Sequence, residues 1–399
     1  MAVSAVGSRI TRTALPVIAV GALAASPAEA ALVGALGWGP GALIGLFGGG
    51  WIDRRSKRGL LVAADLARAA LVLTVPLAWW LDALTLLHVA AVAGAVGAAS
   101  ALFQITDNTY LPELVGHDDL IDANATIEAT DAVAEIGGPA LAGGLIRVLG
   151  APLTVIVDAV TYLWSAALLL TIAPTPPAAA ARGAAAPSSV WADLRAGMGT
   201  VWHDLVLRRL LLVDAVTHVS SGFFLGLYMV FVLRDLALSE ATVGVIIGCG
   251  GAGALLGALL APRLGRGPRP ATLAALVLLQ AGAALLIPAA RGPTAAVIAL
   301  LVVHQLVGDG ARTAFHVQAV TLRQRRLPPA LLGRGNGAFH AVMTLSLLSG
   351  ALASAVLAEA AGTRTALWLG LGAGLLAPLA LLGLRLDAAP PAAPAPPPD

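Results

Sequence analysis

Residues 241–261 have the sequence ATVGVIIGCGGAGALLGALLA, and this charge-free stretch decides the fold class. A membrane-spanning α-helix needs roughly 20 mainly apolar residues, which is the length of this stretch. Its glycines would weaken a helix in water, but small residues are common where membrane helices pack closely. The stretch therefore predicts a transmembrane helix.

The composition of the whole chain agrees with a membrane protein. Of its 399 residues, 58% are hydrophobic and 12% are charged. Soluble domains carry about 25% charged residues, which cover their surface. The net charge of +2 is too small to indicate a nucleic-acid partner. The one cysteine, Cys249, excludes an intrachain disulfide and a thiolate metal cluster. We therefore expect the lipid bilayer to surround the chain.

Further apolar stretches of similar length occur along the chain. Four more are free of charge, and six contain one or a few ionisable residues. With an N-terminal run at 2–22, they predict twelve transmembrane helices. The charge-free stretches are Ala30–Trp51, Ala271–Ala290, Gly335–Ala358 and Thr365–Leu384, and the others are about 60–81, 84–108, 123–147, 151–172, 209–233 and 293–316.

The basic residues predict the orientation of the helices. If the segments alternate in direction, most arginines and lysines fall on one side, and the positive-inside rule makes that side cytoplasmic. We expect a multi-pass protein of the cytoplasmic membrane with both termini in the cytoplasm. The opposite loops carry chiefly Arg147, Arg234, Arg291 and Arg364. The cytoplasmic loops include Arg54, Arg55, Lys57, Arg58, Arg263, Arg266, Arg269, Arg323, Arg325, Arg326 and Arg334.

The chain divides into two similar halves. Gly49, before a basic loop, has a counterpart in Gly257, and Asn124 has one in Asn336. Parallel repeats joined by a linker are typical of transporters with a central site. We therefore expect an all-α membrane fold of two pseudo-symmetric six-helix bundles. Its parts are an N-terminal bundle at 1–172, a cytoplasmic linker with an interfacial helix at 173–208, a C-terminal bundle at 209–386 and a disordered Pro/Ala tail at 387–399.

The N-terminal run allows two interpretations. Arg9 and Arg12, the apolar residues that follow, and the sequence Ala28-Glu29-Ala30 also fit a cleavable secretory signal. Cleavage there would leave eleven helices and place the basic loops on the wrong side of the membrane. We therefore expect a first transmembrane helix here.

The segment Gly49–Arg68, GGWIDRRSKRGLLVAADLAR, is similar to the loop between the second and third helices of the major facilitator superfamily. The family pattern is Gly-x-x-x-Asp-Arg/Lys-x-Gly-Arg/Lys-Arg/Lys, and only Ser56 departs from it. The resemblance implies a latch that favours the outward-open state, held by charge-assisted bonds to a neighbouring helix terminus. The alternative is an ordinary basic loop. The latch residues are Gly49, Asp53, Arg54, Lys57 and Arg58.

Three further stretches narrow the resemblance to one branch of that superfamily. Tyr110–Val115 followed by Asp122–Ala125 is similar to a loop of the drug–proton antiporter branch that contains enterobactin-exporter-like proteins. Gly138–Gly144, GPALAGG, resembles the antiporter motif Gly-Pro-x-x-Gly-Gly, with Ala142 in place of the first glycine of the pair. The motif residues are Gly138, Pro139, Gly143 and Gly144.

The third stretch, Gly7–Pro16, is similar to the middle of that branch's first helix. This match implies that the sequence begins inside or close to the first helix, so that about ten residues of a complete first helix would precede Met1. We therefore expect a first helix that is truncated in this sequence.

Segment 123–147 carries three acids, Glu128, Asp131 and Glu135, at i, i+3 and i+7. With Asn124 they fall within roughly 60° of arc, and Glu135 lies about 18 Å along the helix, near the middle of the bilayer. Facing lipid, the acids would cost on the order of 8–10 kcal/mol together. They must face protein or water, and we expect them to bind and release the coupling proton.

An alternative role for these acids is structural. The resemblance implies that the first predicted helix is their neighbour, and it carries Arg9 and Arg12. These arginines would then neutralise the acids as permanent ion pairs. Both interpretations stay open at the level of sequence.

Two other predicted helices carry polar residues on one face. Asp214 and His218 are separated by i, i+4, and Asp309, Arg312 and His316 share roughly 60° of arc. The resemblance implies that these helices line the transport cavity, which makes Asp214, His218, Asp309 and Arg312 candidates for substrate contact. The alternatives are hydrogen bonds between helices and, for Asp309 with Arg312, a self-contained ion pair.

The motifs favour transport over enzymatic activity. The sequence has neither a Gly-x-x-x-x-Gly-Lys-Ser/Thr phosphate loop nor a His-Glu-x-x-His zinc site. We expect no cofactor and no metal site. The leading hypothesis is a monomeric secondary active transporter that exports a drug, siderophore or secondary metabolite in exchange for protons by alternating access. The alternatives are a gradient-driven uniporter or importer and a non-transporting membrane scaffold or sensor.

Overall fold

The computed structural model describes residues 2–25, 29, 33, 36–37, 39–116, 118–172, 190–265 and 269–384. Within these ranges it contains α-helices and short 3-10 and π segments, and no strand. The all-α fold expected from the sequence is confirmed. Most of the predicted linker, 173–189, and the predicted tail, 387–399, lie outside the described residues.

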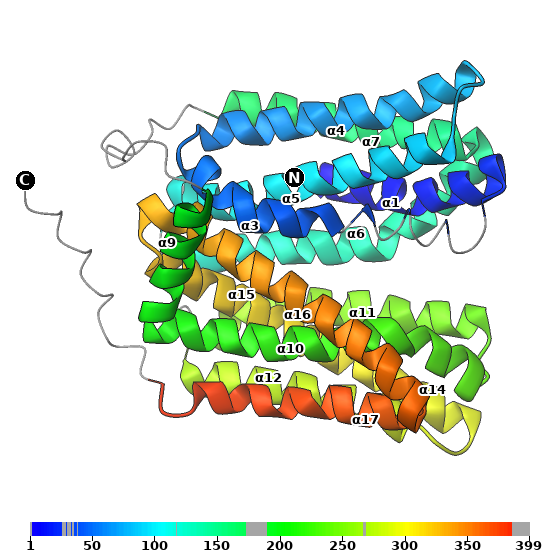
Figure 1. Cartoon of the computed structure of the whole chain (residues 1–399). Coiled ribbons are helices and arrows are strands. Elements are labelled where there is room, and N and C mark those ends of the chain that lie inside the picture. Colours follow the sequence, from blue (N-terminus) through cyan, green and yellow to red (C-terminus); the bar gives the residue numbers. More distant parts are fainter. Residues whose placement is uncertain are drawn as a thin grey trace, which may run out of the picture.

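The first half of the chain forms one group of helices (Figure 1). Within it, α4 packs against α5 and α7, and α1 packs against α6 and α7. Its core contains fully buried Ile18, Val72 and Val155. The helices are α1 (Ala2–Leu23), α3 (Gly39–Asp53), α4 (Lys57–Trp80), α5 (Leu86–Val115), α6 (Leu120–Leu149) and α7 (Ala151–Thr171).

The second half forms another group, in which α10 packs along α16 and α11 packs along α15 (Figure 1). Its helices are α10 (Leu205–Val230), α11 (Glu240–Leu260), α12 (Pro270–Ala284), α13 (Leu286–Ala289), α14 (Thr294–Val303), α15 (Asp309–Arg326), α16 (Leu332–Ala361) and α17 (Thr363–Ala373). The π segments are η1 (Phe231–Asp235) and η3 (His304–Gly308), and the 3-10 segments are η2 (Ala261–Leu264), η4 (Pro329–Leu331) and η5 (Gly374–Leu381).

A further helix, α9 (Val190–His203), lies across one end of both groups (Figure 1). It contacts α3 of the first group and α10 and α16 of the second. Val201 is fully buried, whereas Trp191 and Trp202 are exposed. This end of the molecule is called the α9 end below.

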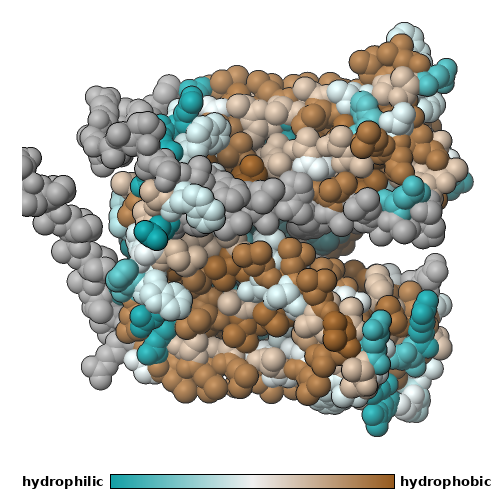
Figure 2. Space-filling view, viewed as in Figure 1, coloured by the Kyte–Doolittle hydropathy of each residue, from teal (hydrophilic) through white to brown (hydrophobic). Residues whose placement is uncertain are grey.

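Nine helices in the described residues are long and apolar enough to cross a membrane, and a tenth counts if the two parts of α6, which bend by 43°, form one span. Apolar residues cover the flanks of the helices in Figure 2, and hydrophilic residues gather toward their ends. This arrangement fits a bilayer whose apolar core meets the flanks. The predicted number of twelve spans stays a prediction.

The helix boundaries differ from the predicted spans most strongly around α15. The sequence predicts a span that ends near residue 316 and a loop containing Arg323, but α15 continues to Arg326. Arg323 is only 6% exposed, and its guanidinium lies 4.6 Å from the ring centre of Phe339. Cations in the last turn of a helix are favourable because they face the carbonyl end of the helix dipole, so the basic residues do not end the helix.

The two groups contact each other through α3 with α16 and through α6 with α11 and α15. At the first contact, a Cβ atom added at Gly49 would lie 2.7 Å from the carbonyl oxygen of Gly333, so the two backbones approach closely. At the second, a Cβ atom added at Gly251 would overlap the side chain of Ile136. Small residues therefore bring the two halves together.

Candidate functional site

The three acids of α6 lie among basic residues of other helices. Arg9 of α1 forms an ion pair with Glu135, with Nη1 and Oε2 2.5 Å apart. His316 of α15 lies 3.5 Å from Glu128, between Nε2 and Oε1. Asp131 interacts electrostatically with Arg9 and with both neighbouring acids. The same face of α6 thus meets α1 of its own group and α15 of the other.

These acids are only partly covered by protein. The side chain of Glu135 is 56% exposed and that of Glu128 is 25% exposed. Arg12 interacts electrostatically with Glu135 and Asp131. The structure therefore brings together all five residues that the sequence predicts for this site, and it contains one of the ion pairs that the structural alternative requires. Their function stays a prediction.

The predicted α15 residues join the same region. Arg312 forms an ion pair with Asp309, with Nε and Oδ1 3.1 Å apart, and Glu128 interacts electrostatically with Arg312. Asp309 lies against the backbone of α11 at Gly250. Asp309 and Arg312 thus form the local pair that their i, i+3 spacing allows, and Arg312 also faces the acid of the other half.

The predicted α10 residues lie deeper in the second group. Asp214 is 7% exposed, and His218 donates from Nδ1 to the carbonyl oxygen of Asp214 over 2.8 Å. Asp214 interacts electrostatically with His218, Arg323 and His316. His316 therefore connects this cluster with Glu128 of α6.

The predicted latch loop contacts a helix terminus of the other half through Asp53, and its role as a latch stays a prediction. The two carboxylate oxygens of Asp53 accept hydrogen bonds from the backbone N–H groups of Gly333 (2.6 Å) and Arg334 (3.0 Å), which lie in the first turn of α16. These N–H groups have no partner within the helix, so an acid is favoured there. Asp53 thus caps a helix of the other half.

The basic residues of the latch loop hold it to its own half. Lys57 forms an ion pair with Glu113 of α5. Arg58 donates to the carbonyl oxygens of Leu169 (2.9 Å) and Leu170 (2.5 Å) in α7. Arg54 is exposed. The basic residues therefore fix the loop to two helices of its own half, and Asp53 contacts a third helix, α16, in the other half.

Buried amides also connect the halves at the α9 end. Asn124 of α6 donates to Thr321 Oγ1 (3.0 Å) and Gln324 Oε1 (2.8 Å) of α15. Gln324 in turn donates to the carbonyl oxygen of Asn108 (3.0 Å), and Asn336 of α16 donates to Thr109 Oγ1 (3.4 Å). The two asparagines that the sequence pairs as counterparts therefore both bond across the halves.

In the second half of the chain, Ala261 occupies the position that corresponds to Asp53, and its contact with the first half is apolar. Ala261, at the end of α11, is fully buried in a cluster with Ile121 and Ala125 of α6. Gln318 of α15 donates to the carbonyl oxygen of Ala261 (2.8 Å). Together with the Asp53 contact and the amides, this cluster closes the space between the halves at the α9 end.

The glycines of the antiporter motif lie in two environments. A Cβ atom added at Gly138 would overlap the side chain of Arg9, so this glycine lets α1 and α6 approach. No atom lies within 4 Å of a Cβ atom added at Gly143 or Gly144. The side chain of Pro139 lies outside the described residues.

A cavity of about 490 Å³ lies between α6 and α11. It is lined on α6 by Thr126, Thr130 and Val133, which are offset by two residues from the acids. Two residues correspond to about 200° around a helix, so the acids lie on the other face of α6. Glu128, Asp131 and Glu135 therefore do not line this lateral cavity, whose lining on α6 includes a different acid, Asp122.

Sequence reasoning missed two further acids inside the helices. Asp107 lies in α5 and interacts electrostatically with Asp131. Asp158 of α7 is fully buried and accepts a hydrogen bond from Thr161 Oγ1 (3.2 Å). Each is the single acid of a predicted span, so neither could be recognised from a spacing between acids on one helix face. A count of ionisable residues within each span would have found both.

Metal-ligating side chains show no clustering in the part of the chain that the structure describes. No group of three or more His, Cys, Asp or Glu side chains is placed there to hold a metal ion.

Comparisons with known proteins point to one family. Residues 1–303 match the sequence model of the Major Facilitator Superfamily. An uncharacterized MFS-type transporter of Sinorhizobium fredii, y4rN, is 28% identical over 343 residues, which cover 82% of this chain and 78% of that protein.

Solved structures share the fold at lower identity. A bacterial homologue of the iron transporter ferroportin in an outward-facing state superposes with a TM-score of 0.78 at 18% identity, covering 95% of this chain and 96% of that one. The human organic anion transporter MFSD10 (TETRAN) superposes with a TM-score of 0.64, also at 18% identity, covering 95% and 98%. At this identity the similarity concerns the fold alone.

Proposed function

The chain is a transporter of the major facilitator superfamily, and we propose that it exports a small organic molecule in exchange for protons. The substrate would be a drug, siderophore or secondary metabolite, as in the drug–proton antiporter branch that its motifs resemble. The observation that carries the proposal is the row of partly exposed acids on α6 between α1 and α15.

The position of the acids suits coupling because they touch both halves. Glu135 is paired with Arg9 of its own half, whereas Glu128 faces His316 and Arg312 of the other half. Movement of the halves would change the partners of Glu128. A carboxylate that loses a cationic partner in a poorly hydrated site is better accommodated in its neutral form, so movement and proton binding become linked.

The state of the molecule supports alternating access between two bundles, one on each side of the linker at 173–208. The α9 end is closed by the Asp53 contact and the buried amides. The basic loops predict that this end is cytoplasmic, which makes this an outward-facing conformation. The outward-facing state of the structural neighbour with a TM-score of 0.78 agrees with this interpretation.

The test uses Glu135→Gln in inverted membrane vesicles. A proton gradient is recorded by quenching of acridine orange, and a panel of organic cations, organic anions and divalent metal ions is added. For an antiporter, a transported compound restores the fluorescence. We expect Glu135→Gln to slow this recovery about tenfold or more, because loss of a positioned proton-transfer group typically has effects of at least this size.

The control is Glu359→Gln, which makes the same change at an exposed acid near the end of α16. With this variant the fluorescence should recover at the same rate as with the unaltered protein. An unchanged rate in Glu135→Gln would remove this acid from coupling. Uptake of a radiolabelled compound without fluorescence recovery would favour the uniporter or importer, and neither uptake nor recovery with any compound would favour the scaffold.

A further inference from the structure

A pocket of about 340 Å³ lies at the end of the second group opposite α9. It is formed by the end of η1 and the segment after it, the turn between α13 and α14 with the start of α14, and the start of α17. Its volume is at the lower end of the range for ligand pockets, about 300–1,000 Å³. Because it is remote from the α6 acids, it does not depend on the proposed transport mechanism.

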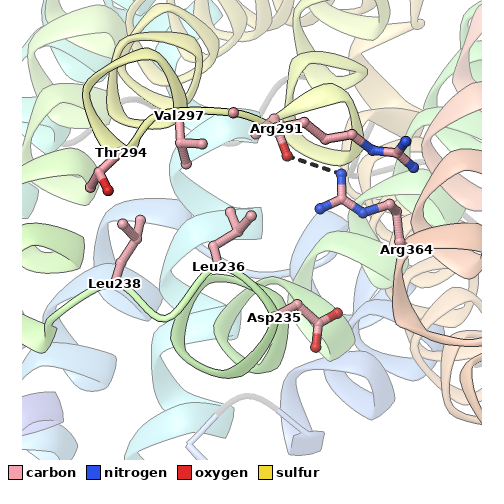
Figure 3. A pocket seen from close by; sticks show the side chains of 9 residues that line it. Asp235, Leu236, Leu238, Arg291, Thr294, Val297 and Arg364 are labelled. Atoms are coloured by element: carbon pink, nitrogen blue, oxygen red, sulfur yellow. Dashed lines mark hydrogen bonds between the residues drawn. The ribbon is translucent and has the colours of Figure 1, made fainter.

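Two arginines form one wall of this pocket, Arg291 and Arg364 (Figure 3). They interact with each other as like charges. Among the described residues, no carboxylate lies within ion-pairing distance of either guanidinium, although Asp235 also lines the pocket. Two neighbouring cations against one more distant acid leave a net positive charge that an anion would compensate.

The guanidinium of Arg364 is held in place before any ligand binds. Its Nη1 donates to the carbonyl oxygens of Pro288 (2.7 Å) and Ala290 (2.9 Å), and the group lies 4.9 Å from the ring centre of Phe231. Figure 3 shows one hydrogen bond of the Arg364 guanidinium as a dashed line, with the Arg291 guanidinium nearby. A fixed cation loses little conformational entropy on binding, which favours affinity.

The backbone adds to the positive field. Thr294, which lines the pocket, is the first residue of α14, and Arg364 is the second residue of α17. Helix N-termini present N–H groups without partners and stabilise anions. The opposite wall is apolar, with Leu236, Leu238 and Val297.

We propose that this pocket binds a phosphate group through Arg291 and Arg364. A guanidinium matches phosphate oxygens with paired N–H donors. The phosphate could be that of a lipid headgroup, whose hydrocarbon would meet the apolar wall, or of a soluble phosphate compound. Both sources share the same chemistry at the two arginines.

The test measures binding to the full chain, purified in a neutral detergent. One arm titrates inorganic phosphate by calorimetry. The other arm adds phosphatidylglycerol and counts the lipids retained by native mass spectrometry. Binding in the first arm identifies a soluble phosphate as sufficient, and binding only in the second identifies a lipid headgroup.

Two substitutions should change affinity in opposite directions. Arg291→Gln removes an exposed cation and should weaken binding about tenfold or more, as expected for loss of a charge-assisted hydrogen bond. Asp235→Asn removes the one acid of the pocket and should strengthen binding several-fold. An unchanged unfolding temperature would show that both variants fold.

The matched control is Arg147→Gln, an exposed arginine in the last turn of α6, away from the pocket. It should leave both arms unchanged. The proposal is overturned if neither probe binds, if Arg147→Gln weakens binding as much as Arg291→Gln, or if Asp235→Asn fails to strengthen it.

Discussion

Asp53 shows how one side chain connects the two halves of this transporter. Its carboxylate takes the place of a capping residue for α16, whose own preceding residue, Leu331, offers no side-chain hydrogen bond. A carboxylate accepts from both N–H groups at once, whereas an amide presents one acceptor and one donor. An acid at position 53 is therefore explained by the two N–H groups that it binds at the start of α16, in the other half.

The first prediction concerns the substitution Asp53→Asn. The asparagine oxygen can accept from one N–H group, and its NH2 group would face the other. A hydrogen bond to a charged group contributes about 1.5–3 kcal/mol, so the closed α9 end should open about ten to a hundred times more often. Hydrogen exchange of the Gly333 and Arg334 amides should accelerate by the same factor.

Its control is Asp118→Asn, which changes an exposed carboxylate in the turn between α5 and α6. Exchange at the start of α16 should then match that of the unaltered protein. Equal exchange rates in Asp53→Asn and in the unaltered protein would show that Asp53 does not hold the two halves together.

At this scale the sequence predicts which residues share one face of a helix better than it predicts which residues they contact. The spacing of Glu128, Asp131 and Glu135 places them on one face, and the structure has them there. The resemblance implied a helix terminus as the partner of the latch loop, but the sequence could not say which one, because Gly333 and Arg334 contribute backbone atoms that no side-chain pattern encodes. The pairing of Arg9 with Glu135 was one of two open alternatives, since spacing within one helix does not fix its neighbours.

Among the elements, α11 and α15 show why glycines recur inside the apolar stretches. A Cβ atom added at Gly257 of α11 would overlap the carbonyl oxygen of Gly310 in α15. A Cβ atom added at Gly253 would lie 2.5 Å from the carbonyl oxygen of Leu306. Two successive turns of α11 thus lie directly on backbone, as expected for closely packed membrane helices.

We predict that Gly257→Ala destabilises the protein. Backbone cannot move aside as a side-chain tip can, so the added methyl group should cost about 1–3 kcal/mol through overpacking. The unfolding temperature of the purified protein in detergent should fall.

Gly248→Ala provides the comparison within the same helix, because no atom lies within 4 Å of its added Cβ atom. An alanine there should leave the unfolding temperature unchanged or raise it, since alanine favours the helix by about 0.5–1 kcal/mol. Equal effects of the two substitutions would contradict a packing role for Gly257.

The existence of the elements could be predicted, but their interior breaks could not. Apolar stretches locate the helices because only a hydrogen-bonded helix satisfies the backbone in lipid. Local caps then set several starts: Thr85 accepts from His88 N–H at α5, and Ser239 accepts from Thr242 N–H at α11. The π segment η3 lies within the predicted span 293–316 and packs against α11 and α12, and the composition of this span does not indicate it.

For the whole molecule, the distribution of arginines predicts which end faces the cytoplasm. Alkaline phosphatase is active only outside the cytoplasm, so its insertion between Gly292 and Pro293, in the turn between α13 and α14, should give an active enzyme. Its fusion after Leu384 should be inactive, and green fluorescent protein fused there should fluoresce.

A reversed result at both sites would place the α9 end outside and contradict the positive-inside assignment. Activity at both sites would show an even number of spans between them instead of the three predicted, so the experiment also tests the predicted count over residues 293–384.

The two closing contacts at the α9 end differ in chemistry although they occupy related positions in the halves. On one side the carboxylate of Asp53 meets backbone amides, and on the other Ala261 meets Ile121 and Ala125. Because the Asp53 side chain is only 6% exposed, salt screens the first contact only in part, whereas salts such as sulfate and phosphate strengthen the second. We therefore expect the two halves to separate first between α3 and α16, while α6 and α11 stay in contact and act as the hinge. The ionic strength of the cytoplasm would then set how often the α9 end opens.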